Sequence, residues 1–453
     1  MRRAAMRERR PSMPCRCADG ERAAAAQARA RVPCFADMSV PHPLSATSYA
    51  ARIAFVVELA ERLHSYGTTA QRLEGAVTSV AQKLRLECEP WSNPTGLILT
   101  FSDPQRPMGD SDTTRVIRLP PGENDLYRLS ETDRIAEDVM AGRLDLAAGH
   151  AALEALDRPR TRRWRAMQVF GYGLAAGAVA ALLRLPWLDI GVAAVNGLMI
   201  GLLVDVSGQR PRLREALEAI AGMFAAAAVV LVANFVAPLN QNTVIIASLI
   251  VLLPGMALTN AVNELTSQHL VSGTARFAGA VTTVVKLAVG TVIGLYLADL
   301  VGLEPVVRAW RPQDGWVEWA GLAVASYAFA VLFRAHRADY PKVMAAAAGG
   351  YLISRFVGLA WGSPAGIFLA ALVMTALGNA YARWGNRPGA ILRVPGIILL
   401  VPGSVSLRGL LNMLQQQDVQ VGQDAVLAVV NILLALIAGL IFGNLLLPSR
   451  RNL

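Results

Sequence analysis

Two short stretches decide the fold of this chain: IVLLPGMAL at residues 250–258 and ILLVPGSVSL at residues 398–407. Each places a Pro-Gly pair near the middle of an apolar segment. Proline cannot donate the helical hydrogen bond and clashes with the preceding turn, and glycine relaxes the backbone. We therefore expect both helices to kink or break here, which leaves unpaired carbonyls before the proline and unpaired amides after it.

The residues around both Pro-Gly pairs form a candidate substrate site. Unpaired backbone groups persist in hydrocarbon only inside protein or beside a water-filled cavity. The start of each second half-helix carries about +0.5 charge, which suits a carboxylate. The candidate substrate-binding residues of the two stretches are Pro254, Gly255, Thr259, Asn260, Pro402, Gly403 and Ser404. A plain packing kink is the alternative, because proline and glycine are common in membrane helices.

Both stretches lie in a region of successive apolar windows. The chain has 453 residues, of which only 17% are charged, against about 25% in soluble domains. A bilayer-spanning helix needs about 20 mainly apolar residues. Ten windows meet this need: 166–183, 187–206, 217–237, 243–264, 276–300, 316–333, 342–361, 364–382, 391–411 and 425–447. The pattern predicts an integral membrane protein and excludes a simple soluble enzyme.

The ten predicted spans divide into two halves of five, at residues 166–301 and 316–447, and a Pro-Gly helix is fourth in each half. Because five is odd, the second half must cross the membrane in the opposite sense. This is an inverted-topology repeat, which is common in secondary transporters. We expect a substrate between the two Pro-Gly helices near the midplane, and alternating access by rocking of one half against the other.

Basic residues outside the windows lie mostly on one side of the predicted membrane. They precede the first span and follow the second, fourth, sixth and eighth. Because cytoplasmic loops carry the excess of Lys and Arg, this distribution predicts a cytoplasmic N-terminus. The net charge of +10 is then spread along one membrane face, which excludes a nucleic-acid groove.

Ionisable residues inside the predicted spans are candidates for function. Lys286 lies deep in its window, where a cation costs roughly 2.5–3.5 kcal/mol, and Arg355 lies nearer the end of its own. No acidic residue lies at comparable depth, so we expect an anionic group to arrive with the substrate. Pairing with acidic residues near the helix ends, such as Asp205 and Glu264, is the alternative. These two residues are also the candidate proton carriers.

The region before the spans, residues 46–165, predicts a small cytoplasmic α+β domain. Helical spacing of apolar residues begins near Ile53 and stops at Gly67, and Thr68 with Gln71 resembles a capping box that opens a second helix. The further elements expected are strands at 96–101 and 115–119 and helices at 125–140 and 146–156. No nucleophile and base have a catalytic spacing, and we interpret His64 as a surface or capping residue.

The first 45 residues are rich in Arg, Ala and Pro, and we expect them to form a disordered basic tail without a cleavable signal peptide. Met38 is an alternative start. Cys15 and Cys17 could form half of a metal site, but no partner pair follows. We therefore expect no metal and no cofactor.

The order of a soluble front and two five-helix halves resembles the threonine/serine exporter (ThrE) family over about residues 47–447. The segments that carry the resemblance are His64-x-x-Gly67, Arg72-Leu73-Glu74, Asn93-Pro94-Thr95, Pro121-Gly122 to Leu126, Leu253-Pro254-Gly255 and Val394-Pro395-Gly396 to Val401-Pro402-Gly403-Ser404. The basic tail departs from the family pattern.

The resemblance implies a secondary exporter of threonine and serine in the bacterial cytoplasmic membrane, driven by the membrane potential or a proton gradient. It implies a transporter and no enzyme activity, with the solute and the lipid bilayer as partners, and it is compatible with a homo-oligomer. The alternatives are a dicarboxylate exporter of the same fold, a membrane-bound hydrolase that uses the front domain, and a passive channel or scaffold.

Overall fold

The computed structural model describes residues 48–105, 112–303, 312–385, 387–416 and 419–448. The expected basic tail, residues 1–45, lies outside these ranges. Up to residue 161 the structure has four helices and a three-stranded sheet. The helices are α1 (Tyr49–Ser65), α2 (Ala70–Lys83), α3 (Leu126–Met140) and α4 (Leu146–Ala155), and the strands are β1 (Glu87–Asn93), β2 (Gly96–Ser102) and β3 (Thr113–Arg118). We call this part the front domain.

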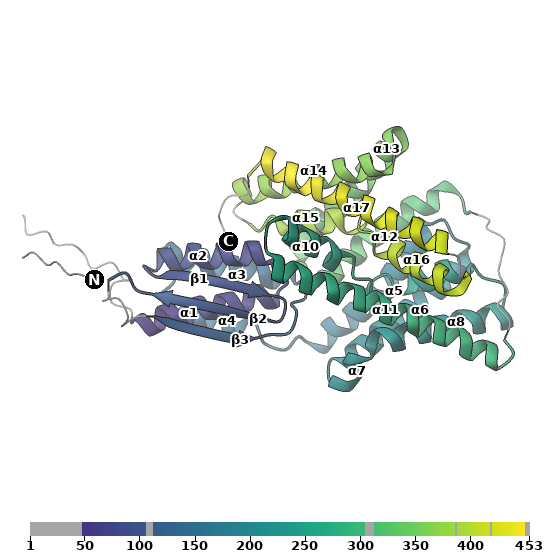
Figure 1. The fold of residues 1–453 in the computed structure, drawn as a ribbon, viewed down its shortest axis with the longest axis horizontal. Coiled ribbons are helices and arrows are strands. Elements are labelled where there is room, and N and C mark those ends of the chain that lie inside the picture. The colour runs from purple at the N-terminus through teal and green to yellow at the C-terminus, as the bar shows by residue number, and fades with distance from the viewer. Residues whose placement is uncertain (1–47, 106–111, 304–311, 386, 417–418, 449–453) are drawn as a thin grey trace, which may run out of the picture. The chain divides into compact units, whose positions relative to one another are not determined.

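The sheet is antiparallel in the order β1-β2-β3, with Trp91 opposite Ile98 and Ile98 opposite Val116, and Figure 1 shows the helices packed along it. Strand β1 was not expected, because Pro90 interrupts it and buried residues such as Cys88 are sparse along it. The helices cover the sheet face that carries Leu97, Leu99 and Phe101, all fully buried.

A polar side chain caps the start of each described front-domain helix except α2. Asp125 accepts a hydrogen bond from the Arg128 amide at the start of α3, as a capping residue should. The predicted capping box of α2 is wrong: Thr69 is the N-cap and its side chain makes no capping bond. The Ala70 amide instead donates to the carboxylate of Glu264, 3.0 Å away, in a distant helix.

Apolar helices fill the rest of the chain. They are α5 (Arg162–Leu182), α6 (Trp187–Ser207), α8 (Leu217–Phe235), α11 (Leu270–Leu300), α12 (Gly315–Leu332), α13 (Tyr340–Trp361), α14 (Ser363–Gly385) and α17 (Val419–Leu446). Shorter pieces are α7 (Pro211–Glu215), α9 (Gln241–Ser248), α10 (Gly255–Thr266), η2 (Arg337–Asp339), α15 (Ala390–Ile398) and α16 (Gly403–Gln416). We call this part the membrane region.

Eight helical segments among the described residues are long and apolar enough to cross a membrane. Two of the ten expected spans are not among these eight. One is α5, which begins with basic residues, and the other is the pair α9 and α10, which are separate short helices. The segment that contains α15 and α16 counts as one span. The chain is therefore a mostly helical integral membrane protein.

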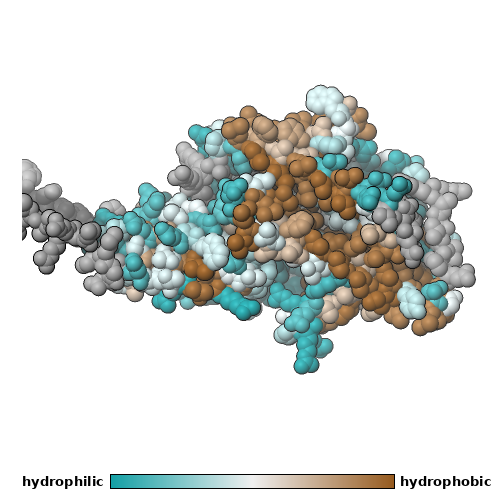
Figure 2. Space-filling model, viewed as in Figure 1, coloured by the Kyte–Doolittle hydropathy of each residue, from teal (hydrophilic) through white to brown (hydrophobic). Residues whose placement is uncertain are grey.

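The surface agrees with a membrane location. Figure 2 shows apolar residues gathered over the helices of the membrane region and polar residues over most of the front domain. Large side chains such as Leu359 and Trp361, each 77% exposed, stand out from the helices. A water-soluble protein rarely exposes so large an apolar surface.

Close backbone contacts hold neighbouring helices together. A methyl group on Gly350 of α13 would overlap with the carbonyl oxygen of Gly396 in α15. Small residues allow this approach, which membrane helices use in place of a hydrophobic driving force. The front domain joins the same core, because Phe55 and Leu59 belong to one apolar cluster with Phe329 of α12.

Candidate functional site

Both Pro-Gly helices are broken where the sequence predicts. The first stretch ends α9 at Ser248 and starts α10 at Gly255, and the second ends α15 at Ile398 and starts α16 at Gly403. Non-helical turns join the two pieces in each case. The expectation of two interrupted helices is confirmed.

The two breaks meet. A Cβ atom placed on Gly403 would lie 3.4 Å from the Cα atom of Gly255, and one placed on Gly255 would overlap with the side chain of Val401. From this point α10 extends to the front domain, where its Glu264 contacts Ala70, and α16 extends to α9 and α11. Figure 1 shows α10 close to the front domain and α16 farther from it.

A cavity of about 980 Å³, which we call the central cavity, is lined by the first three residues of both half-helices, 255–257 and 403–405. The first helical hydrogen bonds come from Leu258 and Ser406, which donate to the Pro254 and Pro402 carbonyls, both at 2.9 Å. The three amides before each donor therefore have no acceptor within their helix. Two positive helix ends converge on one cavity, which favours an anion there.

Charged side chains of both signs also line the central cavity. Asp205 of α6 is one of them, and it lies 3.8 Å from Arg165, a partly exposed pair. Exposed Arg408 of α16 is another, and it forms no ion pair with any residue that the structure describes. Arg408 was not among the predicted site residues, because it lies in the last turn of the predicted window 391–411, where a long charged side chain can reach the membrane surface. The cavity thus offers partners for a carboxylate and for an ammonium group.

Two predicted site residues that follow the first break lie elsewhere. Thr259 is buried, and its hydroxyl donates to the Gly255 carbonyl at 3.2 Å, so its bond is made within the helix. Asn260 lines a second cavity, beside the front domain. Four of the predicted residues near the breaks line the central cavity, namely Pro254, Gly255, Gly403 and Ser404.

The interpretation of Lys286 as an isolated deep cation is wrong. Its ammonium lies 3.0 Å from the Glu215 carbonyl and 3.5 Å from the Glu218 carboxylate, and 40% of its side chain is exposed. Helix α11 begins at Leu270, earlier than the predicted window, and its 31 residues are longer than a bilayer needs. Lys286 therefore lies level with the first turn of α8, where Glu218 is found.

Arg355 also has a carboxylate partner. It forms an ion pair with Glu318 in the first turn of α12, and the Tyr351 hydroxyl donates to the same carboxylate at 2.9 Å. The sequence predicts that neither Lys286 nor Arg355 has an acidic partner within the protein, and both predictions are wrong. Acids at the start of one helix face cations within its neighbour, which sequence spacing alone does not reveal.

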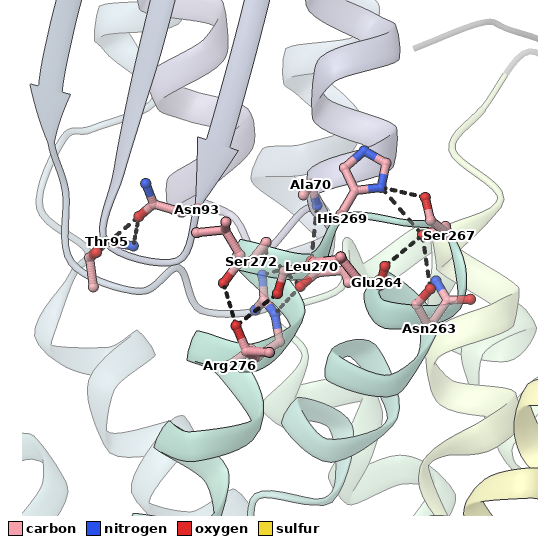
Figure 3. A network of polar contacts seen from close by, with 12 residues as sticks. Ala70, Asn93, Thr95, Asn263, Glu264, Ser267, His269, Leu270, Ser272 and Arg276 are labelled. Carbon is pink, nitrogen blue, oxygen red and sulfur yellow. Dashed lines mark hydrogen bonds and ion pairs between the residues drawn. The ribbon is translucent and has the colours of Figure 1, made fainter.

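Glu264 is the centre of a buried network between α10, α11 and the front domain (Figure 3). Its carboxylate is fully buried and accepts two bonds from Arg276 at 3.0 Å, one from Ser272 at 2.8 Å and one from the Ala70 amide. Glu264 therefore joins the front domain to the membrane region.

The family motifs of the front domain have structural roles. Glu74 contacts His269 of the membrane region at 3.0 Å, and Arg72 lies 3.8 Å from Asp133, so each has a partner outside its own helix. His64 is buried beside the Pro120 carbonyl at 3.2 Å, and burial lowers the pKa of its imidazole. A neutral, buried histidine fits neither the predicted surface position nor a catalytic pair.

Comparison with known proteins identifies the family. Residues 54–298 match the ThrE family model, and residues 318–446 match a second model, described as "Threonine/Serine exporter, ThrE". The chain belongs to the threonine/serine exporter family. The first match covers most of the front domain and α5–α11, and the second covers most of α12–α17.

Curated relatives are distant and fungal. An uncharacterized protein of Schizosaccharomyces pombe is 22% identical over 74% of this chain and 45% of its own length. Pheromone-regulated membrane protein 10 is 23% identical over 76% of this chain in Yarrowia lipolytica and Debaryomyces hansenii, which covers 30% and 35% of those proteins. The chain thus spans less than half the length of these relatives. No solved structure matches.

Proposed function

We propose that this ThrE-family protein exports small hydroxy amino acids, threonine and serine, through the central cavity. The observation that carries the proposal is the convergence of two half-helix N-termini on one cavity that also contains Asp205 and Arg408. An amino acid brings one carboxylate and one ammonium group. A cavity with positive helix ends, a guanidinium and a carboxylate can complement both.

The substrate carboxylate would accept hydrogen bonds from the free amides of Gly255, Gly403 and Ser404 and an ion pair from Arg408. Pro254 and Pro402 would keep these amides free, because each proline ends the preceding helix. The ammonium group would face Asp205, which we retain as the candidate proton carrier. The substrate hydroxyl would bond to carbonyls in the turns before each proline.

We further propose ten crossings in two inverted repeats, with α5 and the pair α9 and α10 as the additional spans. Equivalent helices pack against each other in both halves: α5 with α6 and α12 with α13, and likewise α8 with α11 and α14 with α17. The front domain would lie in the cytoplasm and the chain in a cytoplasmic membrane. Rocking of one half against the other would open the central cavity alternately to each side.

Efflux from cells tests the substrate and the site together. A strain without its own exporters is loaded with threonine dipeptides, and external threonine is followed with and without the chain. We expect efflux with the chain and at least about a tenfold loss with Arg408→Gln, because a charged hydrogen bond contributes about 1.5–3 kcal/mol. Arg383→Gln, an exposed arginine of α14, serves as the matched control and should retain efflux.

Counterflow in proteoliposomes separates the rival substrates. Exchange of labelled threonine for threonine, but not for succinate, is the expected result. Succinate exchange without threonine exchange would replace the proposal with the dicarboxylate exporter. An absence of exchange with either solute would contradict transport of both classes.

A further inference from the structure

A second cavity of about 350 Å³ lies between the front domain and the membrane region, and we call it the junction cavity. The start of α2 lines it from the front domain, and α10, α14, α15 and α17 line it from the membrane region. Met256 and Asn124 line both this cavity and the central one, so the two are neighbours. The proposed export site does not use it.

The charges around the junction cavity have one sign. Arg72 of α2 and Arg393 of α15 line it, with amide side chains such as Asn260 between the helices, and no acidic residue lines it within the described ranges. The central cavity differs, because Asp205 and Glu123 lie there beside arginines. The junction cavity therefore suits a ligand with negative charge and no positive charge.

Arg393 has no counter-charge of its own. It is partly buried, and its guanidinium forms neither a hydrogen bond nor an ion pair with any residue that the structure describes. The other cation that lines the same cavity is Arg72. Arg72 has an ion-pair partner of its own in Asp133, 3.8 Å away, which lines neither cavity. Two cations in a partly buried site repel more strongly than in water, which a bound anion would relieve.

We propose that the junction cavity binds a small dianion, a dicarboxylate or a phosphate, between Arg72 and Arg393. Guanidinium groups match such oxyanions with paired hydrogen bonds, and the amide of Asn260 can donate to a remaining oxygen. A zwitterionic amino acid fits less well, because its ammonium group would face two cations. The ligand would connect α2 of the front domain to α15 of the second half. The proposal does not depend on which solute is exported.

Equilibrium dialysis of the purified full chain in detergent tests this site. Labelled phosphate and labelled succinate are the probes, at constant ionic strength. We expect saturable binding of at least one probe and a loss of affinity of about tenfold or more in Arg393→Gln, the effect of one charged hydrogen-bonding group. Arg383→Gln, an exposed arginine of α14, is the matched control and should bind as the parent does.

Further variants keep the test decisive if Arg393→Gln fails to fold. Asn260→Asp adds a negative charge to the same cavity and should also weaken binding, whereas Arg393→Lys should retain part of it. Binding of phosphate alone or of succinate alone supports the site and identifies which of the two classes of anion it binds. The proposal is overturned by parent-like affinity in both Arg393→Gln and Asn260→Asp, by displacement of the probes with L-threonine, or by the absence of saturable binding. Loss in Arg408→Gln but not in Arg393→Gln would also overturn it, because the anion would then lie in the central cavity.

Discussion

Individual residues differ in how far the sequence reveals their roles. Pro254 and Gly255 can be assigned from sequence, because the chemistry that breaks a helix belongs to the residues themselves. Lys286 and Arg355 cannot, because their partners lie at the starts of other helices. Arg408 was missed for a related reason. Its depth in the membrane depends on where α16 begins after the break, which the sequence does not show.

Two adjacent glycines of α13 provide a test of packing at single-residue resolution. Gly350→Ala would place a methyl group on the Gly396 carbonyl, whereas a methyl group on Gly349 meets nothing within 4 Å. Overpacking costs about 1–3 kcal/mol or more, so Gly350→Ala should lower the thermal unfolding temperature in detergent and Gly349→Ala should not. Equal unfolding temperatures for the two variants would refute the close contact between α13 and α15.

Asp133 should make the stability of the chain depend on pH. Burial raises the pKa of its carboxyl from 3.8 to about 7. Between these values the folded chain holds a proton that the unfolded chain has lost, so this contribution to the free energy of unfolding decreases as pH rises to about 7 and is then constant. The penalty reaches up to about 4 kcal/mol, from a shift of about three units.

The Asp133→Asn variant removes this titration. Its stability relative to the parent should therefore be greater at pH 8 than at pH 5, as measured by thermal unfolding at both pH values. Asp145→Asn, a helix cap of α4, is the control. A difference between Asp133→Asn and the parent that is the same at both pH values would contradict the raised pKa.

At the scale of elements, the contact between the start of α2 and Glu264 of α10 is one that the sequence pattern predicts wrongly. The start of α2 resembles a self-sufficient capping box, but its first amide is capped by Glu264 from α10. The four donors around this carboxylate come from α2 and α11. A local motif predicts the position of the helix start, and tertiary contacts decide which group caps it.

Breaking the Glu264 network should therefore be costly. Glu264→Gln leaves Arg276 with an unpaired buried charge, and such losses amount to about 3–5 kcal/mol. The double variant with Arg276→Met should be more stable than Glu264→Gln alone, and Glu154→Gln, which affects an exposed pair, should change stability by less than about 1 kcal/mol. Thermal unfolding of the parent, these three variants and Arg276→Met alone measures this, and additive effects of the two network substitutions would contradict the coupling.

At the scale of the whole molecule, hydropathy was enough to indicate an integral membrane protein. The two family models match residues 54–298 and 318–446, and the inverted repeat stays a prediction. Sequence spacing could not show that α10 and α16 start beside each other, because their residues are more than a hundred positions apart. Sequence spacing could not show the junction cavity either, because its lining residues come from the front domain and from both halves of the membrane region.

The most direct test of the central claim is a structure of the purified protein with bound L-threonine, determined by electron cryomicroscopy. We expect its carboxylate within hydrogen-bond distance of the first-turn amides of both α10 and α16, in the cavity that contains Asp205 and Arg408. Threonine bound elsewhere, or bound with these amides turned away from it, would contradict the proposal that the two helix breaks form the transport site.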